Sequence, residues 1–144
     1  MRVADIIVVN NLKRAWEFLC EHVDEAVDWS FVSHYNTIIG IGSIANPDKL
    51  RTIPVRIGGT DWTPNVPTIE SARACIGDAS LLHDPESRAV VIFLAISRGQ
   101  WFANGNKRTL LMVANHCLIN AGVGIFSVAP RVEARFYTAF ACVL

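Results

Sequence analysis

The sequence predicts an all-α domain with a small β-hairpin flap. Apolar residues recur at helical spacing along most of the chain, and only one short stretch alternates with period two. The chain has 144 residues, of which 51% are hydrophobic and 18% charged. This composition excludes a disordered chain, and the length suffices for the core of one domain. We therefore expect residues 1–144 to form a single domain, with truncation at one or both ends left open.

Two helices are expected in the first part of the chain. Between about Asn10 and Val23, apolar residues fall on one helical face with charges opposite. Trp29 to Tyr35 predicts a second, shorter helix. After it, the glycines and proline of residues 40–47 break the helical pattern and predict an irregular region.

Residues 50–67 carry a different signal. Val55 and Ile57 flank Arg56 with period two, and the glycine pair at 58–59 is a turn signal, so this stretch predicts a short hairpin. Prolines on both sides of it exclude a place in a large central sheet. We expect a surface flap on a helical body.

The helical period returns at Thr68, which is a plausible N-cap. Asp84 followed by Pro85 is a sharper helix start, and that helix should run to about Arg98 with apolar residues almost all round. A second such helix is expected from about Lys107 to Asn120. A last helix should begin near Pro130.

Charge and composition exclude several classes of function. The 13 basic and 13 acidic residues balance, and no basic stripe indicates nucleic-acid binding. The longest apolar run, residues 89–96, is too short to span a membrane. The four histidines lack a partner at metal spacing, so no metal site is predicted, and His116 lies too far along its helix to act as a base. The cysteines have no metal or redox spacing either, which favours buried reduced thiols and a cytoplasmic protein. These cysteines are Cys20, Cys75, Cys117 and Cys142.

The loop between the two most apolar helices is the most unusual segment. Gly105 and Asn106 tolerate left-handed backbone geometry, so successive amides can turn inward just before a helix N-terminus, where negative charge is favoured. Lys107 and Arg108 then occupy the end of the helix that disfavours cations unless an anion lies between them. The pattern predicts an anion site, although an ordinary interhelical turn has the same residue types.

Residues 102–109, read as Phe-Ala-Asn-Gly-Asn-Lys-Arg-Thr, resemble the Fic/Doc signature, H-x-F-x-[D/E]-G-N-[G/K]-R, and the Lys-Arg-Thr ending is the Doc-like form. Residues 50–67 are similar to the family's arginine-containing flap, and residues 113–122 resemble the helix after the signature. The resemblance implies a helical Fic-like bundle. It further implies transfer of AMP from ATP to a hydroxyl of a target protein, or of phosphate in Doc-like members.

The resemblance also assigns roles to residues. Asn104, Gly105, Asn106, Lys107 and Arg108 would bind the phosphates of ATP or another nucleoside triphosphate. Phe102 would anchor the loop in the core. The flap residues Val55, Arg56 and Ile57 would dock a target protein as an added strand. No inhibitory helix motif is found, which leaves two expectations open: restraint by an antitoxin-like partner, or no need for restraint.

The chain departs from the signature at the residues that perform chemistry. Gln100 stands where the family has its catalytic histidine, and an amide cannot act as a general base, although it can orient a hydroxyl. Asn104 replaces the acidic residue that holds Mg²⁺, which predicts a weak magnesium site. A second arginine of AMP-transferring members is Leu111 here. The prediction is a Fic/Doc-like nucleotide-binding protein related to enzymes that transfer AMP or phosphate, with Gln100 and Asn104 in place of the usual histidine and acidic residue. The alternative is a non-catalytic pseudo-enzyme that binds a nucleotide or a protein, for example as part of a toxin–antitoxin pair.

Overall fold

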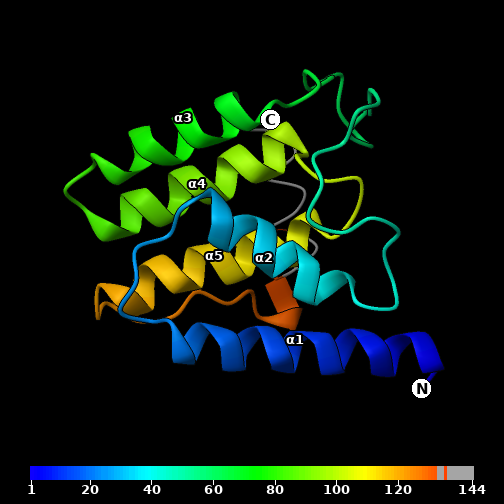
Figure 1. The fold of residues 1–144 in the computed structure, drawn as a ribbon, viewed down its shortest axis with the longest axis horizontal. Coiled ribbons are helices and arrows are strands. Elements are labelled where there is room, and N and C mark those ends of the chain that lie inside the picture. Colours follow the sequence, from blue (N-terminus) through cyan, green and yellow to red (C-terminus); the bar gives the residue numbers. More distant parts are fainter. Residues whose placement is uncertain (133–134, 136–144) are drawn as a thin grey trace.

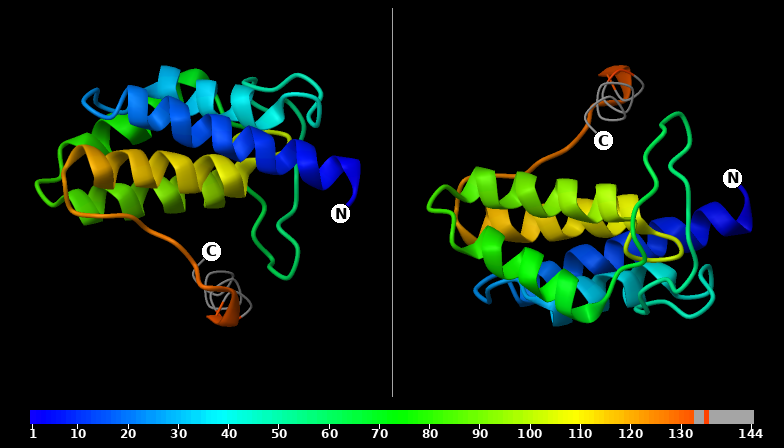
Figure 2. Two further views of the ribbon diagram at one scale, coloured as in Figure 1. Left: turned by 90° about the horizontal axis from the view of Figure 1, so that it is seen from below. Right: turned by 90° about the horizontal axis from the view of Figure 1, so that it is seen from above.

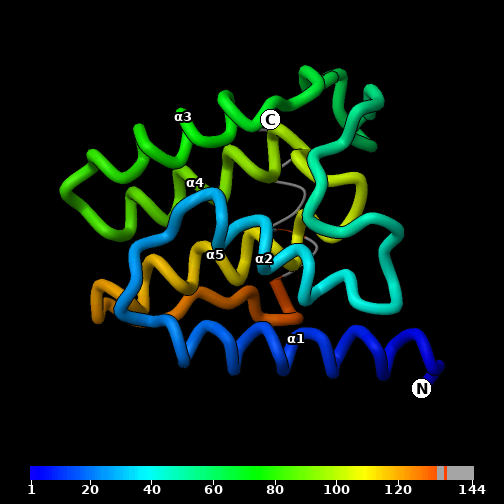
Figure 3. The backbone as a smooth tube through the Cα atoms, viewed as in Figure 1, coloured from blue at the N-terminus to red at the C-terminus, as the bar shows by residue number. Residues whose placement is uncertain are grey.

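The computed structural model describes residues 1–132 and 135, and it consists of helices joined by short connections and one long irregular segment (Figure 1). The central helix, α5, packs against α4, α2 and α1, while α3 covers α4 from the far side. The backbone trace shows α1 lying along one edge of the bundle (Figure 3). The elements are α1 (Val3–Glu21), α2 (Trp29–Gly40), α3 (Ile69–Ser80), α4 (Pro85–Gly99) and α5 (Asn106–Asn120).

Three of the helices begin at side chains that cap them. Asp28 accepts a hydrogen bond from the Phe31 amide at 3.0 Å, and Thr68 accepts one from the Ser71 amide at 3.1 Å. Asp84 accepts from the amide of Ser87 at 2.9 Å. Each oxygen satisfies one of the amides that a helix start leaves without an intrahelical partner. The helix starts predicted at Thr68 and at Asp84 are therefore confirmed.

Other helix limits differ from the prediction. The first helix begins at Val3 instead of near Asn10, and the second continues to Gly40 instead of ending at Tyr35. Helix α4 is not buried on all sides, because Val90 is 54% exposed. Residues 130–132 are helical, as expected for a helix from Pro130, and most of the range predicted for that helix lies outside the described residues.

The prediction that residues 50–67 form the two strands of a hairpin is wrong. Within the described residues, strand-like pairing is limited to one antiparallel bridge, between Leu50 and Phe102. The turn is present, since the Thr60 amide donates to the Ile57 carbonyl at 3.2 Å. Residues 50–67, hereafter the flap segment, instead form an irregular excursion that projects beyond the helices (Figure 2).

Polar groups at the centre of the bundle are paired. His116 is fully buried; its Nδ1 accepts from the Tyr35 hydroxyl at 2.8 Å, and its Nε2 donates to the Glu25 carbonyl at 2.9 Å. The network ties α2 and α5 to the connection between α1 and α2.

No described helix combines the length and apolar character that crossing a membrane requires. The thiols are less buried than expected: Cys20 is exposed, Cys75 and Cys117 are half-buried, and Cys142 lies outside the described residues.

Candidate anion-binding site

The loop between α4 and α5 borders a surface hollow of about 290 Å³. The sequence singled out this loop, and most of its predicted site residues meet here. The hollow is lined by Gln100, Ala103, Asn104, Gly105, Asn106, Lys107 and Arg108.

Gly105 shapes the entry into α5. Its φ of +78° is left-handed, and a Cβ at this position would lie 2.9 Å from Cδ1 of Ile44 and 3.1 Å from Nδ2 of Asn36. A glycine is therefore needed both for the backbone conformation and for the close approach of α2. The Gly105 amide donates to Oδ1 of Asn104 at 2.7 Å, so this amide is not available to a ligand.

The backbone amides of the first turn of α5 remain available to a ligand. The Gly105 carbonyl already accepts from the Thr109 amide at 2.9 Å, but no described group accepts from the amides of Asn106 or Arg108. Unpaired amides at a helix N-terminus carry a partial positive charge and are a ready anion site.

The side chain of Asn106 holds the loop instead of facing a ligand. Its Oδ1 accepts from the Phe102 amide at 3.0 Å, and its Nδ2 donates to the Phe102 carbonyl at 2.7 Å. Phe102 itself is 2% exposed and stacks on Trp29 with ring centroids 5.9 Å apart. Asn106 can therefore contribute its backbone amide, not its side chain, to an anion.

Gln100 has a left-handed backbone, with φ of 44°, and its side chain is engaged at both ends. Its Nε2 donates to the Ser97 carbonyl at 2.6 Å, and its Oε1 accepts from Nδ2 of Asn106 at 3.3 Å. Gln100 reaches the hollow, but these bonds turn its amide towards the protein.

Arg108 lies in the first turn of α5 and also borders a neighbouring hollow of about 320 Å³ that Trp16 and Leu111 help to line. Its Nη1 is shielded from solvent and has no hydrogen-bond acceptor among the described residues. A buried guanidinium nitrogen without an acceptor is costly, and an anion would satisfy it. Lys107 is exposed at the rim of the hollow.

The three flap residues do not enter the hollow. Val55 and Ile57 are half-buried and Arg56 is exposed, and none of the three lines the hollow. They lie in an irregular segment without strand pairing, so an added strand would find no preformed strand here.

Comparison with solved structures relates this arrangement to a known fold. A structure of residues 134–508 of Fic-1 from C. elegans matches 99% of this chain with a TM-score of 0.80. The fold is Fic-like. The sequence identity is 16%, and this chain spans 45% of the length of that structure, so the match establishes the fold and not the activity. No protein-family model matches the sequence, and no curated protein does.

The residues that line the hollow do not fit a magnesium ion. No carboxylate is among the described residues that line the hollow. The described residues also contain no cluster of three acidic, histidine or cysteine ligands. Oδ1 of Asn104 is a neutral ligand and already accepts from Gly105. Mg²⁺ prefers carboxylates or substrate phosphates, so the protein itself offers little to hold it.

Two residues that support the loop were missed from the sequence. Buried Asn36 donates to the Asn104 carbonyl and to Oγ1 of Thr109, both at 3.1 Å, and its Oδ1 accepts from the Asp48 amide at 3.0 Å. Arg51 bonds the carbonyl of Gln100. Neither carries a local motif, because their partners lie far away in the chain.

Proposed function

We propose that this chain is a Fic/Doc-like nucleotide-binding domain that holds the phosphates of a nucleoside triphosphate at the start of α5. The observation that carries the proposal is the buried Nη1 of Arg108, which has no acceptor among the described residues and belongs to the same helical turn as unpaired amides. The planar fork of an arginine suits phosphate oxygens. The Fic-like fold and the Gly-Asn-Lys-Arg sequence of the loop support the same ligand class.

Binding is favoured over catalysis as the function of this site. The family reaction needs a base for the attacking hydroxyl, and residue 100 is a glutamine whose amide is bonded to Ser97 and Asn106. Without that base, the rate should fall by about 10²–10⁴. A transferase in which Gln100 only orients a hydroxyl is the second candidate, and the flap segment would then dock the target protein.

The first test is calorimetric titration with ATP, with and without Mg²⁺, of the wild type and of Arg108→Ala. We expect the substitution to weaken binding about ten- to hundredfold, because hydrogen bonds to charged groups contribute about 1.5–3 kcal/mol. Mg²⁺ is expected to change the affinity for ATP only slightly, because the residues that line the hollow offer it no carboxylate.

Arg73→Ala is the matched control, since Arg73 is exposed on α3 and does not line the hollow. It should bind ATP as the wild type does. Equal affinities of Arg108→Ala and wild type, or no ATP binding by the wild type at millimolar concentration, would refute the nucleotide site. In the latter case an antitoxin-like or other protein partner becomes the remaining candidate ligand.

A further inference from the structure

The flap segment caps the end of α4 with a row of hydrogen bonds. Trp62 Nε1 donates to the Arg98 carbonyl at 3.0 Å. Arg51 then serves the next three carbonyls in turn: Nη2 to Gly99 at 3.0 Å, Nε to Gln100 at 2.6 Å, and the backbone amide to Trp101 at 2.9 Å. Carbonyls at a helix end have no intrahelical donor, so these groups need an outside partner. Here the partner is the flap.

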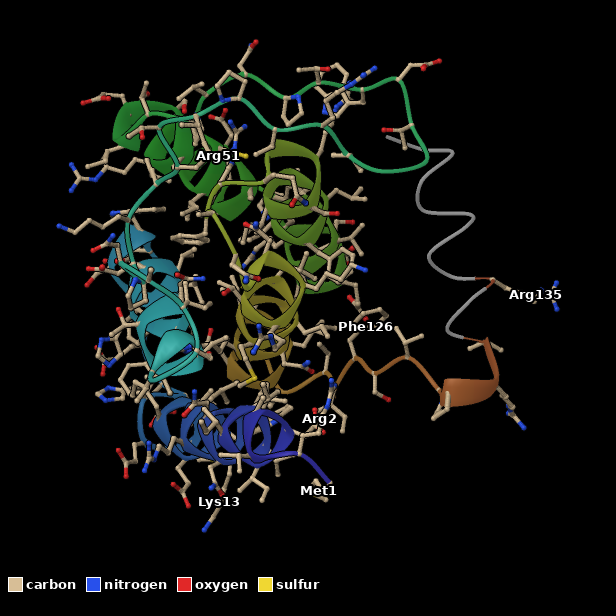
Figure 4. The ribbon with its side chains drawn as sticks, turned by 90° about the vertical axis from the view of Figure 1, so that its right-hand side faces the viewer. Met1, Arg2, Lys13, Arg51, Phe126 and Arg135 are labelled. Atoms are coloured by element: carbon tan, nitrogen blue, oxygen red, sulfur yellow. The ribbon has the colours of Figure 1, made fainter. Side chains whose placement is uncertain are left out.

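Arg51 also connects the first part of the flap segment with its last part. It is 3% exposed, and its guanidinium donates to the carbonyl of Ile53 at 2.8 Å near the start of the flap. The same group donates to the carbonyls of Pro64 and Asn65, at 3.3 and 2.6 Å, near its end. One side chain therefore joins both limbs of the flap to the residues that lead into the anion-binding loop. It lies at the base of the flap in Figure 4.

No carboxylate of the described chain forms an ion pair with this buried cation. Burial lowers the pKa of the Arg51 guanidinium from its ordinary value. The negative end of the α4 dipole and the ring of carbonyl oxygens stabilise the charge instead. A fork of donors aimed at carbonyls is a connection with fixed geometry, which an aliphatic residue or a lysine cannot reproduce.

A second contact joins the same two segments. The guanidinium of Arg98 lies over the ring of Trp62, 4.1 Å from its centroid. Trp62 is thus fixed both at its indole nitrogen and at its face. Arg51 holds the flap segment near its start, at Ile53. Both Arg51 and Trp62 hold it near its end.

We propose that Arg51 is a positioning residue, which sets the place of the flap segment relative to Gln100 and couples flap and anion-binding loop. A protein segment docked on the flap would then lie at a fixed distance from the phosphates at the start of α5. This role rests on the proposed function, because the coupling serves a purpose when both the flap and the hollow bind ligands.

The test is residue-specific amide hydrogen exchange, measured by NMR on the full chain. The reporters are the amides of Gln100 and Phe102, which bond Ile96 and Asn106 and not Arg51. In Arg51→Met, both should exchange about tenfold faster or more, as expected from the loss of hydrogen bonds to a charged group. Amides inside α5 should change much less.

Arg56→Met is the matched control, because it makes the same substitution at an exposed position of the same flap. It should leave both reporters unchanged. Unchanged reporters in Arg51→Met would overturn the proposal. An equal acceleration of every amide would do so as well, because it would indicate loss of global stability instead of local coupling.

Trp62→Phe provides a milder variant in case Arg51→Met does not fold. It keeps an aromatic ring next to Arg98 but removes the indole bond to the Arg98 carbonyl. We expect faster exchange at Gln100 of about threefold or more. Exchange at the wild-type rate would count against a flap that caps α4.

A final measurement separates the positioning role from the proposed function. Addition of ATP to the wild type should protect the first amides of α5 and shift the indole N–H signal of Trp62, which lies outside the hollow. The Trp62 shift should disappear in Arg51→Met. Protection of α5 without a Trp62 shift would refute the coupling and leave ATP binding intact. Absence of any ATP effect would refute the nucleotide site, and the exchange of Gln100 and Phe102 would still decide the role of Arg51.

Discussion

Backbone conformation at single residues determines the shape of the candidate site. Gly105 and Gln100 are both left-handed, with φ of 78° and 44°, and they stand at the two ends of the loop. A glycine adopts this conformation without strain, whereas a glutamine does so at some cost, which its two side-chain bonds and the bond from Arg51 offset. The loop is therefore held in shape before any ligand arrives.

Gly105→Ala should destabilise the protein by about 1–3 kcal/mol, because a Cβ would be strained at this φ and would press on Ile44. The control is Gly77→Ala within α3, where a Cβ meets nothing within 4 Å. That substitution should stabilise by about 0.5–1 kcal/mol. Urea unfolding of both variants measures the difference, and a neutral Gly105→Ala would contradict the required left-handed turn.

A second prediction at this scale tests whether Gln100 and Asn104 limit a transfer reaction. Gln100→His supplies a base and Asn104→Asp supplies a carboxylate for Mg²⁺, so the double variant should transfer label from radioactive ATP to protein. We expect at least about tenfold more label than with either single variant, because base and metal act on different parts of the reaction. If the wild-type protein is labelled as fast as the double variant, Gln100 does not limit the reaction. That result would favour a transferase in which Gln100 orients the hydroxyl.

Among the elements, the helices begin at local signals while the irregular segments depend on distant partners. Thr68, for example, caps α3 through Ser71, three residues away. The end of α4, by contrast, is capped by Arg51 and Trp62 from a segment that precedes it in the chain by tens of residues. Local caps are visible in a sequence, and caps from afar are not.

Thr68→Ala should cost about 1 kcal/mol of stability, since it removes the acceptor for the Ser71 amide. Thr63→Ala, at an exposed position of the flap segment, is expected to change stability by less than about 0.5 kcal/mol. Thermal and urea unfolding would check both, and equal effects would argue against a structural role for the Thr68 hydroxyl.

At the scale of the whole molecule, the buried His116 joins α5 to α2 and to the connection between α1 and α2. Burial lowers the pKa of His116 below its ordinary 6.5, and this effect outweighs the backbone bonds that favour the charged form. Burial also raises the pKa of Tyr35, which therefore stays protonated and donates to His116. Helices α2 and α5 meet through this pair, so protonation of His116 would break a contact on which the core depends.

Stability should therefore decrease as the pH falls below about 6.5, because the unfolded chain then binds a proton that the folded chain resists. Above this pH the histidine is neutral in both states and contributes no pH dependence. Its contribution to the slope is at most about 1.4 kcal/mol per pH unit. Urea unfolding between pH 7.5 and 5 measures it. His116→Gln should flatten the profile, whereas exposed His83→Gln should not; a wild-type profile that is already flat would contradict the neutral core histidine.

The sequence by itself determined the helical class, the starts of α3 and α4, and the unusual loop before α5. These features depend on residues close together in the chain: a capping oxygen reaches three residues ahead, and Gly105 takes its conformation without help from afar. The predicted departures from the Fic/Doc signature at Gln100 and Asn104 likewise come from one short stretch of residues, and they stay predictions.

Only the tertiary structure decided what the flap segment does. Its alternating residues and glycine turn favoured a hairpin, yet its carbonyls bond a buried guanidinium and its prolines lack amides to donate to a neighbouring strand. The same holds for the side chains of Asn36, Asn106 and Gln100, whose bonds fix which groups of the loop remain free for an anion. Such contacts form between segments that meet only in the folded chain, and no local pattern records them.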